Sequence, residues 1–146
     1  MTDPACPICA AHCGEGDLVA PLVWRDDLVW VRHLVNGSAP VMLGHLVVET
    51  DRHAPFVDSL TDEESAAVGR AVRDAARALR SELEVDAVHA MVINRRFEHF
   101  HEHVVVRHRD TPKEYSWHQV DDWTDVPTGG ASEVADLCDR LARHFP

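Results

Sequence analysis

The stretch from Glu98 to Arg107 reads Glu-His-Phe-His-Glu-His-Val-Val-Val-Arg and carries most of the information about fold and chemistry. Its valine run is typical of a β-strand, in which successive side chains point to opposite faces of the sheet. His99, His101 and His103 are therefore expected in a row on one face, about 6.5–7 Å apart. The phenylalanine and two of the valines are expected to enter the core from the opposite face, where Glu102 breaks the apolar pattern. An edge position or a partner arginine would account for Glu102.

A row of three imidazoles has three possible explanations. The first is a polar row that faces solvent. The second is a three-histidine metal site, although residues on one face of a single flat strand converge poorly, so that at most one or two of them would share an ion. The third is a nucleophilic histidine oriented by its neighbours, because a neutral imidazole attacks phosphorus near neutral pH.

The N-terminal segment contains a pair of cysteines, Cys6 and Cys9, separated by two residues. This spacing is typical of a metal knuckle or of a redox pair. The redox alternative lacks its usual placement at the start of a helix that follows a strand, and we expect the first fifteen residues to form a loop or knuckle. Cys13 could act as an alternative metal ligand or remain a free thiol. Cys138 falls on the apolar stripe of the last predicted helix and is expected in the core.

The length of 146 residues, with 45% hydrophobic and 27% charged residues, indicates one globular domain. Strands are expected over 19–24, 28–34, 42–49, 88–93 and 100–107. The first two form a hairpin with Asp26 and Asp27 in its turn. Thr61 and Glu64 form a capping box at the start of the clearest helix, and Ser132 caps a shorter one. The sequence therefore predicts an α+β fold with a mainly antiparallel five-stranded sheet, one long helix and a C-terminal helix.

The formal net charge of -11 argues against a broad basic surface that binds a nucleic acid backbone. A small phosphate ligand remains compatible, since a few donors in a cleft can outweigh a distant acidic surface screened by salt. No apolar run approaches the ~20 residues of a membrane helix. Residues 1–4 lack the basic start and the apolar stretch of a secretory signal. We expect a cytoplasmic protein with neither a membrane nor a nucleic acid as partner.

The segment His99–Val105 resembles the His-x-His-x-His-x-x signature of the histidine triad (HIT) superfamily of nucleotide hydrolases and transferases. Three other segments resemble the family in the same order: Gly44–His53 its strand before the first helix, Thr61–Glu64 the start of its long helix, and Val92–Asn94 the strand before the signature. With the leading Cys-x-x-Cys, the resemblance spans roughly residues 5–107. It implies a HIT-like fold, and in particular the zinc-containing bacterial branch that resembles diadenosine tetraphosphate hydrolases.

The resemblance implies covalent catalysis by the middle histidine of the signature. His101 would attack the α-phosphorus of a nucleotide, and water would then cleave the nucleotidyl-histidine. His103 would lie along the phosphates and help to hold or protonate them. Asn94, before the signature, and Arg107, after it, are candidate substrate-binding residues. Arg107 is explained equally well as a solvated arginine at the end of a strand.

The resemblance also implies a structural zinc ion. In the zinc-containing branch, the ligands are the Cys-x-x-Cys pair, the histidine that ends the third strand and the first signature histidine. These positions match Cys6, Cys9, His53 and His99. Two thiolates and two imidazoles are also a preferred tetrahedral donor set for zinc. Such a site would clamp the N-terminus onto the sheet and would set the register of His101.

Two elements of the family's substrate site are missing from this sequence. The family's glycine-rich stretch ending in Gln-Ser or Gln-Thr binds the α-phosphate, but Asn94–Glu98 is shorter and contains no Gly, Gln or Ser. The family's ribose-binding aspartate is also absent, and Asn36 is the nearest polar candidate. Arg95 and Arg96 could supply the lost phosphate contacts or simply lie on the surface. The segment 117–123, which carries two tryptophans, could close over the pocket or cover the sheet.

We therefore expect a single HIT-like domain over residues 1–146, with a zinc knuckle in 1–15 and a C-terminal extension in 108–146. The expected activity is hydrolysis of a dinucleoside polyphosphate or another adenylylated small molecule at the α-phosphorus. One alternative is a nucleotidyl transferase or specialised-metabolism enzyme with a remodelled phosphate loop, and another is a non-catalytic nucleotide-binding module. The resemblance also implies a homodimer that joins the sheets of two copies at an exposed strand edge.

Overall fold

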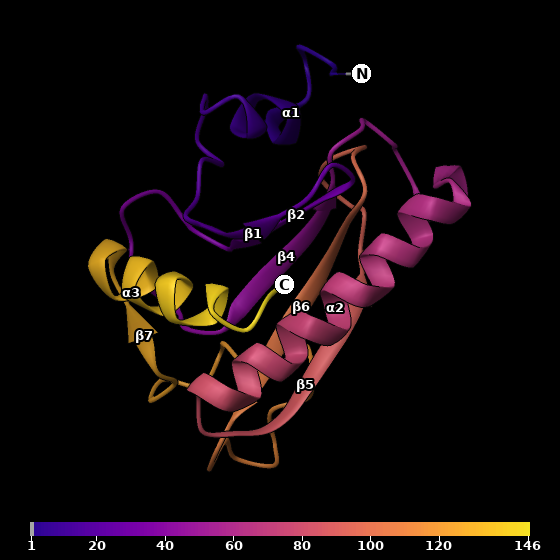
Figure 1. Cartoon of the computed structure of the whole chain (residues 1–146). Coiled ribbons are helices and arrows are strands. Elements are labelled where there is room, and N and C mark those ends of the chain that lie inside the picture. The colour runs from indigo at the N-terminus through magenta and orange to yellow at the C-terminus, as the bar shows by residue number, and fades with distance from the viewer. Residues whose placement is uncertain (1) are drawn as a thin grey trace.

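The structure is a computed structural model that describes residues 2–146 (Figure 1). Its helical segments are α1 (Pro7–His12), a 3₁₀ turn (Val57–Ser59), α2 (Asp62–Glu82) and α3 (Ala131–Ala142). Its strands are β1 (Leu22–Arg25), β2 (Val29–His33), β3 (Val41–Met42), β4 (His45–Thr50), β5 (Val85–Val92), β6 (His101–His108) and β7 (Thr128–Gly129).

Five of the strands form one antiparallel sheet in the order β1-β2-β4-β6-β5. Strands β3 and β7 pair separately as a two-stranded sheet. Helices α2 and α3 pack against each other on the same face of the large sheet, and α1 lies apart from them at one end (Figure 1). The predicted α+β fold, with its antiparallel five-stranded sheet, long helix and C-terminal helix, is confirmed.

Helix α2 begins at the predicted capping box. The hydroxyl of Thr61 accepts a hydrogen bond from the Glu64 amide at 3.1 Å, and the Glu64 carboxylate accepts one from the Thr61 amide at 2.9 Å. These two bonds satisfy amides that the first helical turn leaves without partners. The apolar face of α2 is buried in the core together with Val104 and Val106 of β6, as the alternation along that strand predicts.

The predicted strand over 42–49 is interrupted at Gly44. This residue has a φ of +96°, in the left-handed region that glycine adopts at little cost. A Cβ atom there would lie 2.7 Å from Cγ2 of Val106 and 2.9 Å from Cδ1 of Leu83. The kink and the close approach separate β3 from β4, so that only β4 joins the large sheet.

Two other predicted boundaries are wrong for reasons of local capping. The N-terminal knuckle contains the short helix α1, because the thiol of Cys6 caps it by accepting a hydrogen bond from the Cys9 amide. Helix α3 begins at Ala131 rather than after Ser132, since the Glu133 carboxylate accepts a hydrogen bond from the Gly130 amide at 3.0 Å.

Glu102 has neither of the explanations offered from the sequence. Its strand, β6, lies between β4 and β5, so the residue is not at an edge of the sheet. Among residues 2–146, no ion pair joins it to an arginine. Glu102 is half-buried, and this burial raises the pKa of its carboxyl group.

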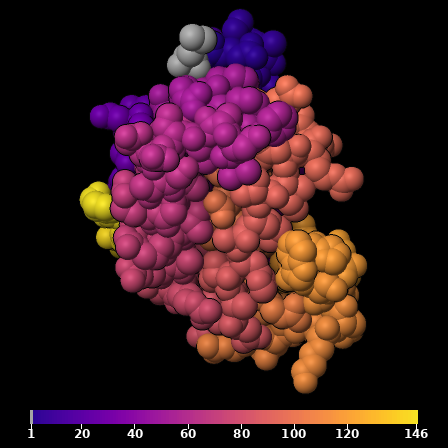
Figure 2. Space-filling view, turned by 90° about the vertical axis from the view of Figure 1, so that its right-hand side faces the viewer, coloured from indigo at the N-terminus to yellow at the C-terminus, as the bar shows by residue number. Residues whose placement is uncertain are grey.

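The segment after β6 forms a bulge beside β5 (orange in Figure 2) before the chain returns to β7 and α3. Val134, Leu137 and Leu141 of α3 belong to the same core as α2 and the sheet. The division of the chain into a knuckle, a domain and a C-terminal extension remains a prediction. None of the helices in residues 2–146 has the length and apolar character needed to cross a membrane.

Gly44 and Gly69 offer a matched pair of substitutions. We expect Gly44→Ala to lower the free energy of unfolding by about 2–4 kcal/mol, because alanine is strained at this φ and would clash with Val106. Gly69 lies within α2 with open space around it, so Gly69→Ala should raise that free energy by about 0.5–1 kcal/mol. Urea unfolding of both variants measures the two changes, and equal effects would contradict the assigned role of Gly44.

Candidate functional site

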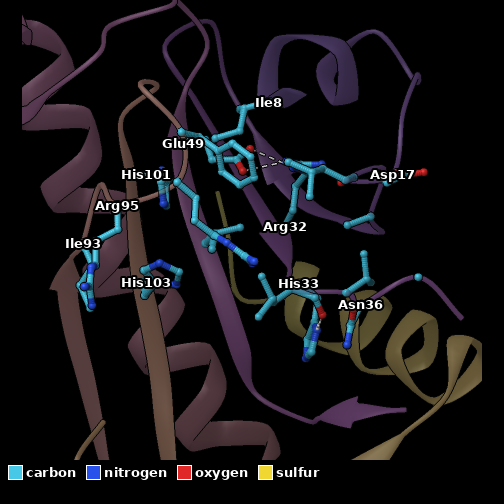
Figure 3. A pocket seen from close by; sticks show the side chains of 18 residues that line it. Ile8, Asp17, Arg32, His33, Asn36, Glu49, Ile93, Arg95, His101 and His103 are labelled. Carbon is cyan, nitrogen blue, oxygen red and sulfur yellow. Dashed lines mark hydrogen bonds and ion pairs between the residues drawn. The ribbon is translucent and has the colours of Figure 1, made fainter. Parts of the chain in front are cut away.

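The sheet face opposite α2 carries a cavity of about 750 Å³ (Figure 3). The register of the antiparallel strands brings the lining residues together. Glu49 of β4 lies opposite His101 of β6, and Val47 of β4 lies opposite His103 of β6 and, on its other side, opposite Arg32 of β2. The lining comes from the N-terminal segment, β2 and the turn after it, β4, the segment after β5, and β6: Ile8, Asp17, Leu18, Ala20, Arg32, His33, Leu34, Val35, Asn36, Gly37, Val47, Glu49, Ile93, Arg95, Arg96, Phe97, His101 and His103.

His101 is oriented by the backbone immediately before it. Its Nδ1 lies 2.8 Å from the carbonyl oxygen of His99. A carbonyl oxygen only accepts hydrogen bonds, so Nδ1 carries the proton and the lone pair of Nε2 is free in the neutral ring. The side chain lines the cavity and is only 7% exposed. This arrangement presents an unprotonated ring nitrogen that is suited to nucleophilic attack.

His103 is hydrogen-bonded to a histidine that sequence reasoning left without a role. Its Nδ1 lies 2.9 Å from Nε2 of His45 on the adjacent strand. Burial, assisted by the nearby rings of His103 and His33, lowers the pKa of His45 to about 3. Burial and the neighbouring His101 also lower the pKa of His103. Both rings are therefore neutral near pH 7, and one donates its proton to the other.

The sequence contained a weak signal for His45. It alternates with Val47 and Glu49 on the predicted strand, and the two-residue period of a strand places these three side chains on one face. Only the register between strands shows that this face adjoins the histidine row.

An ion pair in the cavity lining was also missed from the sequence. Arg32 donates two hydrogen bonds to the Glu49 carboxylate, from Nη2 at 2.7 Å and from Nε at 2.9 Å, and both side chains are buried. Nε2 of His12 lies 2.9 Å from the same carboxylate. Burial alone would raise the pKa of Glu49, but the hydrogen bond from His12 and the charge of Arg32 keep it below its ordinary value. Arg32 also donates to the Leu18 carbonyl, which attaches the N-terminal segment to the sheet.

Four predicted metal ligands lie together beside the cavity. The ligand atoms of Cys6, Cys9, His53 and His99 are all within 4.8 Å of one another. Nδ1 of His99 lies 3.5 Å from both sulfur atoms, and Nδ1 of His53 lies 3.6 Å from the sulfur of Cys9. Ordinary Zn–S and Zn–N bonds in a tetrahedron separate sulfur from nitrogen by about 3.6 Å. The spacing and the donor types therefore fit a zinc ion.

The two histidines of this cluster are oriented through their second ring nitrogens. Nε2 of His99 donates to the Thr50 carbonyl at 2.7 Å, which directs Nδ1 toward the thiols. Nε2 of His53 lies 3.7 Å from a carboxylate oxygen of Asp3. Such partners are typical of metal-binding histidines. Burial lowers the pKa of His99 to about 4, so that the ring keeps the neutral form that binds metals.

The remaining cysteines lie outside this cluster. Cys13 is exposed and Cys138 is buried in the core, the latter as predicted. The Cys6–Cys9 pair does open a helix, α1, which the sequence did not predict, but within residues 2–146 this helix does not follow a strand.

Neither predicted substrate-binding residue lines the cavity. The Arg107 guanidinium donates to three carbonyl groups in the segment after β6, at distances of 2.7–3.2 Å, and so attaches that segment to the sheet. The Asn94 amide donates to the Pro55 carbonyl at 2.7 Å, while its side-chain oxygen is buried without a hydrogen-bond partner in residues 2–146. Trp117 and Trp123 also lie outside the lining; Trp117 is exposed, and Trp123 packs against the core.

Three residues that the sequence offered as replacements for the family's substrate groups do line the cavity. Asn36 follows β2, and Arg95 and Arg96 follow β5. The lining therefore contains polar groups on two sides of the histidines.

The depressed pKa of His45 predicts a dependence of stability on pH. Between about pH 6.5 and pH 3 the unfolded chain protonates this histidine and the folded chain does not. The free energy of unfolding should therefore fall as the pH is lowered from 6.5, by about 1.4 kcal/mol per pH unit for this one group. Urea unfolding between pH 6.5 and 5 should show a shallower slope for His45→Gln. The exposed His118 provides the control, since His118→Gln should keep the wild-type slope. If the free energy of unfolding changes equally with pH in all three proteins, the lowered pKa of His45 is refuted.

The chain resembles known proteins in its fold. No family model and no curated protein matches the sequence. Among solved structures, a HIT-like protein involved in cell-cycle regulation from Bartonella henselae superposes with a TM-score of 0.72 at 15% identity, covering 98% of both chains. A Zn-bound histidine triad family protein from Mycobacterium smegmatis gives 0.69 at 18% identity, covering 96% of this chain and 92% of that one. A hypothetical histidine triad nucleotide-binding protein from Sulfolobus tokodaii gives 0.64 at 14% identity, covering 86% and 83%. The chain has the fold of the histidine triad proteins.

Proposed function

We propose that this protein hydrolyses a nucleotide conjugate at its α-phosphorus, with His101 as the nucleophile. The observation that carries the proposal is the bond from Nδ1 of His101 to the His99 carbonyl, which places the lone pair of the neutral ring on Nε2, in a cavity of about 750 Å³. The fold agrees with it, since the similar Sulfolobus tokodaii protein is named a nucleotide-binding protein. Dinucleoside polyphosphates and other adenylylated small molecules are the substrates considered.

The reaction proceeds in two displacements at phosphorus. The Nε2 lone pair of His101 forms a bond to the α-phosphorus, and the bond from phosphorus to the leaving group breaks with its electron pair on that group. Water then attacks the same phosphorus, so that a P–O bond forms as the bond to Nε2 breaks. The electron pair of the broken bond returns to Nε2, one proton of the water passes to solvent, and the nucleotide is released. His103 lies beside His101, with ring centroids 5.2 Å apart. When Nδ1 of His103 accepts a hydrogen bond from His45, the proton of the neutral His103 ring is on Nε2. His103 then donates a hydrogen bond from Nε2 to the phosphate oxygens.

We further propose that Cys6, Cys9, His53 and His99 hold a structural zinc ion. The donor set is complete with four protein ligands, which is typical of structural rather than catalytic sites. When bound, zinc would supply four bonds that tie α1 and the N-terminal segment to the sheet. The zinc ion would hold the side chain of His99, and the His99 carbonyl would stay in position to accept the hydrogen bond from Nδ1 of His101. The Zn-bound protein from Mycobacterium smegmatis shares this fold.

The free edge of β5 is the proposed contact between two copies of the chain. This eight-residue strand is at one end of the sheet and pairs only with β6 among the described strands. Val92 and, just after it, Ile93 are 41% and 39% exposed. Pairing of two such edges would cover these side chains and satisfy the free backbone groups.

The nucleophile is tested with His101→Ala. We expect turnover of diadenosine tetraphosphate to fall by at least about 10³-fold, because the covalent intermediate cannot form, while nucleotide binding is retained. The exposed His118 again serves as the control, since His118→Ala should keep wild-type turnover. A radiolabelled adenylyl group should be trapped on the wild-type protein by a rapid quench in alkaline denaturant, where the bond from phosphorus to imidazole survives, and should be absent from His101→Ala. Full activity of this variant would refute the proposed mechanism.

The zinc site is tested with Cys9→Ser against Cys13→Ser. The wild-type protein should contain about one zinc ion per chain, and the Cys9 variant should lose most of it because one of four ligands is gone. Its free energy of unfolding should fall by about 3 kcal/mol or more. Cys13 lies outside the cluster, so its variant should keep both the metal and the stability. Atomic emission and urea unfolding supply the two measurements, and equal zinc contents in the two variants would contradict the ligand assignment.

A further inference from the structure

Arg95 and Arg96 are two cationic side chains in the cavity lining that have no ionic partner. Both are exposed residues in the segment between β5 and β6. Within residues 2–146, neither forms a salt bridge or a side-chain hydrogen bond, whereas Arg32, the third arginine of the lining, is paired with Glu49.

The backbone of this segment is fixed on both sides of the arginines. Before them, the Asn94 side chain donates to the Pro55 carbonyl at 2.7 Å. After them, the Phe100 amide donates to the Ala54 carbonyl at 2.6 Å. Arg95 lies on the same side of the cavity as His101 (Figure 3), and the ring of Phe97 is 6.3 Å from the ring of His101. The two guanidinium groups are therefore attached to a supported segment beside the nucleophile.

The cavity lining contains no carboxylate that would neutralise these two charges. Asp17 and Glu49 are the only acidic residues in the lining. Glu49 is already paired with Arg32, and Asp17 lies across the cavity from Arg95 with its carboxylate pointing away from the histidines (Figure 3). Two uncompensated guanidinium groups in a chain of net charge -11 create a local positive region. Such a region favours a ligand with several negative charges.

The reacting phosphate carries less negative charge than the two guanidinium groups carry positive charge. A phosphate that joins a nucleoside to a leaving group carries a single negative charge. Guanidinium groups bind phosphate oxygens in pairs of parallel hydrogen bonds, so two arginines can engage more than one phosphate. The additional negative charge must therefore belong to the leaving group.

We infer that Arg95 and Arg96 bind the phosphate chain of the leaving group, and that the substrates are dinucleoside polyphosphates rather than nucleotides joined to an amine. This inference rests on the proposed function. When Nε2 of His101 attacks, the bond from the α-phosphorus to the bridging oxygen breaks, and the electron pair remains on the departing nucleoside polyphosphate. The two guanidinium groups stabilise the negative charge that this oxygen gains.

The test compares two substrates that share an adenylyl group and differ in the charge of the leaving group. Diadenosine tetraphosphate releases a polyphosphate, and adenosine 5′-phosphoramidate releases ammonia. In Arg95→Gln/Arg96→Gln, we expect kcat/KM to fall by about 30-fold or more for the first substrate and by less than about 3-fold for the second. The double lysine variant should recover part of the loss. Arg70→Gln, an exposed substitution on α2 across the sheet, should change neither value.

Two kinetic outcomes would overturn the inference. Unchanged turnover of diadenosine tetraphosphate would show that the arginines do not contact the leaving group. Equal losses for the two substrates would show that they act on the α-phosphate or on the fold.

A binding measurement separates this inference from the proposed mechanism. Adenosine 5′-tetraphosphate and AMP are titrated against His101→Ala with and without the two glutamine substitutions. The substitutions should weaken tetraphosphate binding by about 10-fold or more and leave AMP binding within about 3-fold. If the wild-type protein turns over neither substrate but the two glutamine substitutions still weaken tetraphosphate binding selectively, the hydrolase is refuted and the polyphosphate site stands. If binding of the two ligands falls equally, or not at all, the polyphosphate site is refuted.

Discussion

His99 is the residue on which the site depends, because three of its groups are fixed by different parts of the fold. Its Nδ1 lies 3.5 Å from the sulfur atoms of Cys6 and Cys9, and its Nε2 donates to the Thr50 carbonyl. Its own carbonyl accepts the Nδ1 proton of His101. A carbonyl oxygen cannot donate a proton, so this contact sets the tautomer of His101 without a titratable partner. The orientation of His101, the proposed nucleophile, is therefore tied to the attachment of the N-terminal helix.

Charged side chains of the sheet also hold the N-terminal segment. Arg32 reaches both the Glu49 carboxylate on β4 and the Leu18 carbonyl, and His12 contacts the same carboxylate. A bare carboxylate opposite His101 would repel a phosphate, and Arg32 neutralises it. Breaking a buried ion pair by removing one partner is costly, because it leaves an uncompensated charge. One wall of the cavity and its charge balance thus depend on the same contacts.

The sequence predicted the elements whose signals are local. The capping box at Thr61 and the alternation along 100–107 needed only the periodicity of helices and strands, and both are confirmed. The Cys–His cluster was assigned from the family resemblance, and the structure brings its four residues together. The partners of Glu49 and the His45–His103 contact depend on the register between strands, which no single segment reveals. The carbonyl partners of Arg107 could not be predicted either, since they lie in a segment whose path the sequence does not indicate.

Burial removes positive charge from histidines in and beside the cavity. It lowers the pKa values of His45 and His103, so these rings contribute hydrogen bonds but no positive charge near pH 7. The sequence also lacks the glycine-rich phosphate stretch expected from the resemblance to histidine triad proteins, so that the proposed anion binding cannot rely on it. Guanidinium groups remain charged at any physiological pH. In the proposed reaction the chain therefore separates two tasks: histidines would supply the nucleophile and the directed hydrogen bonds, and Arg95 and Arg96 would supply the charge.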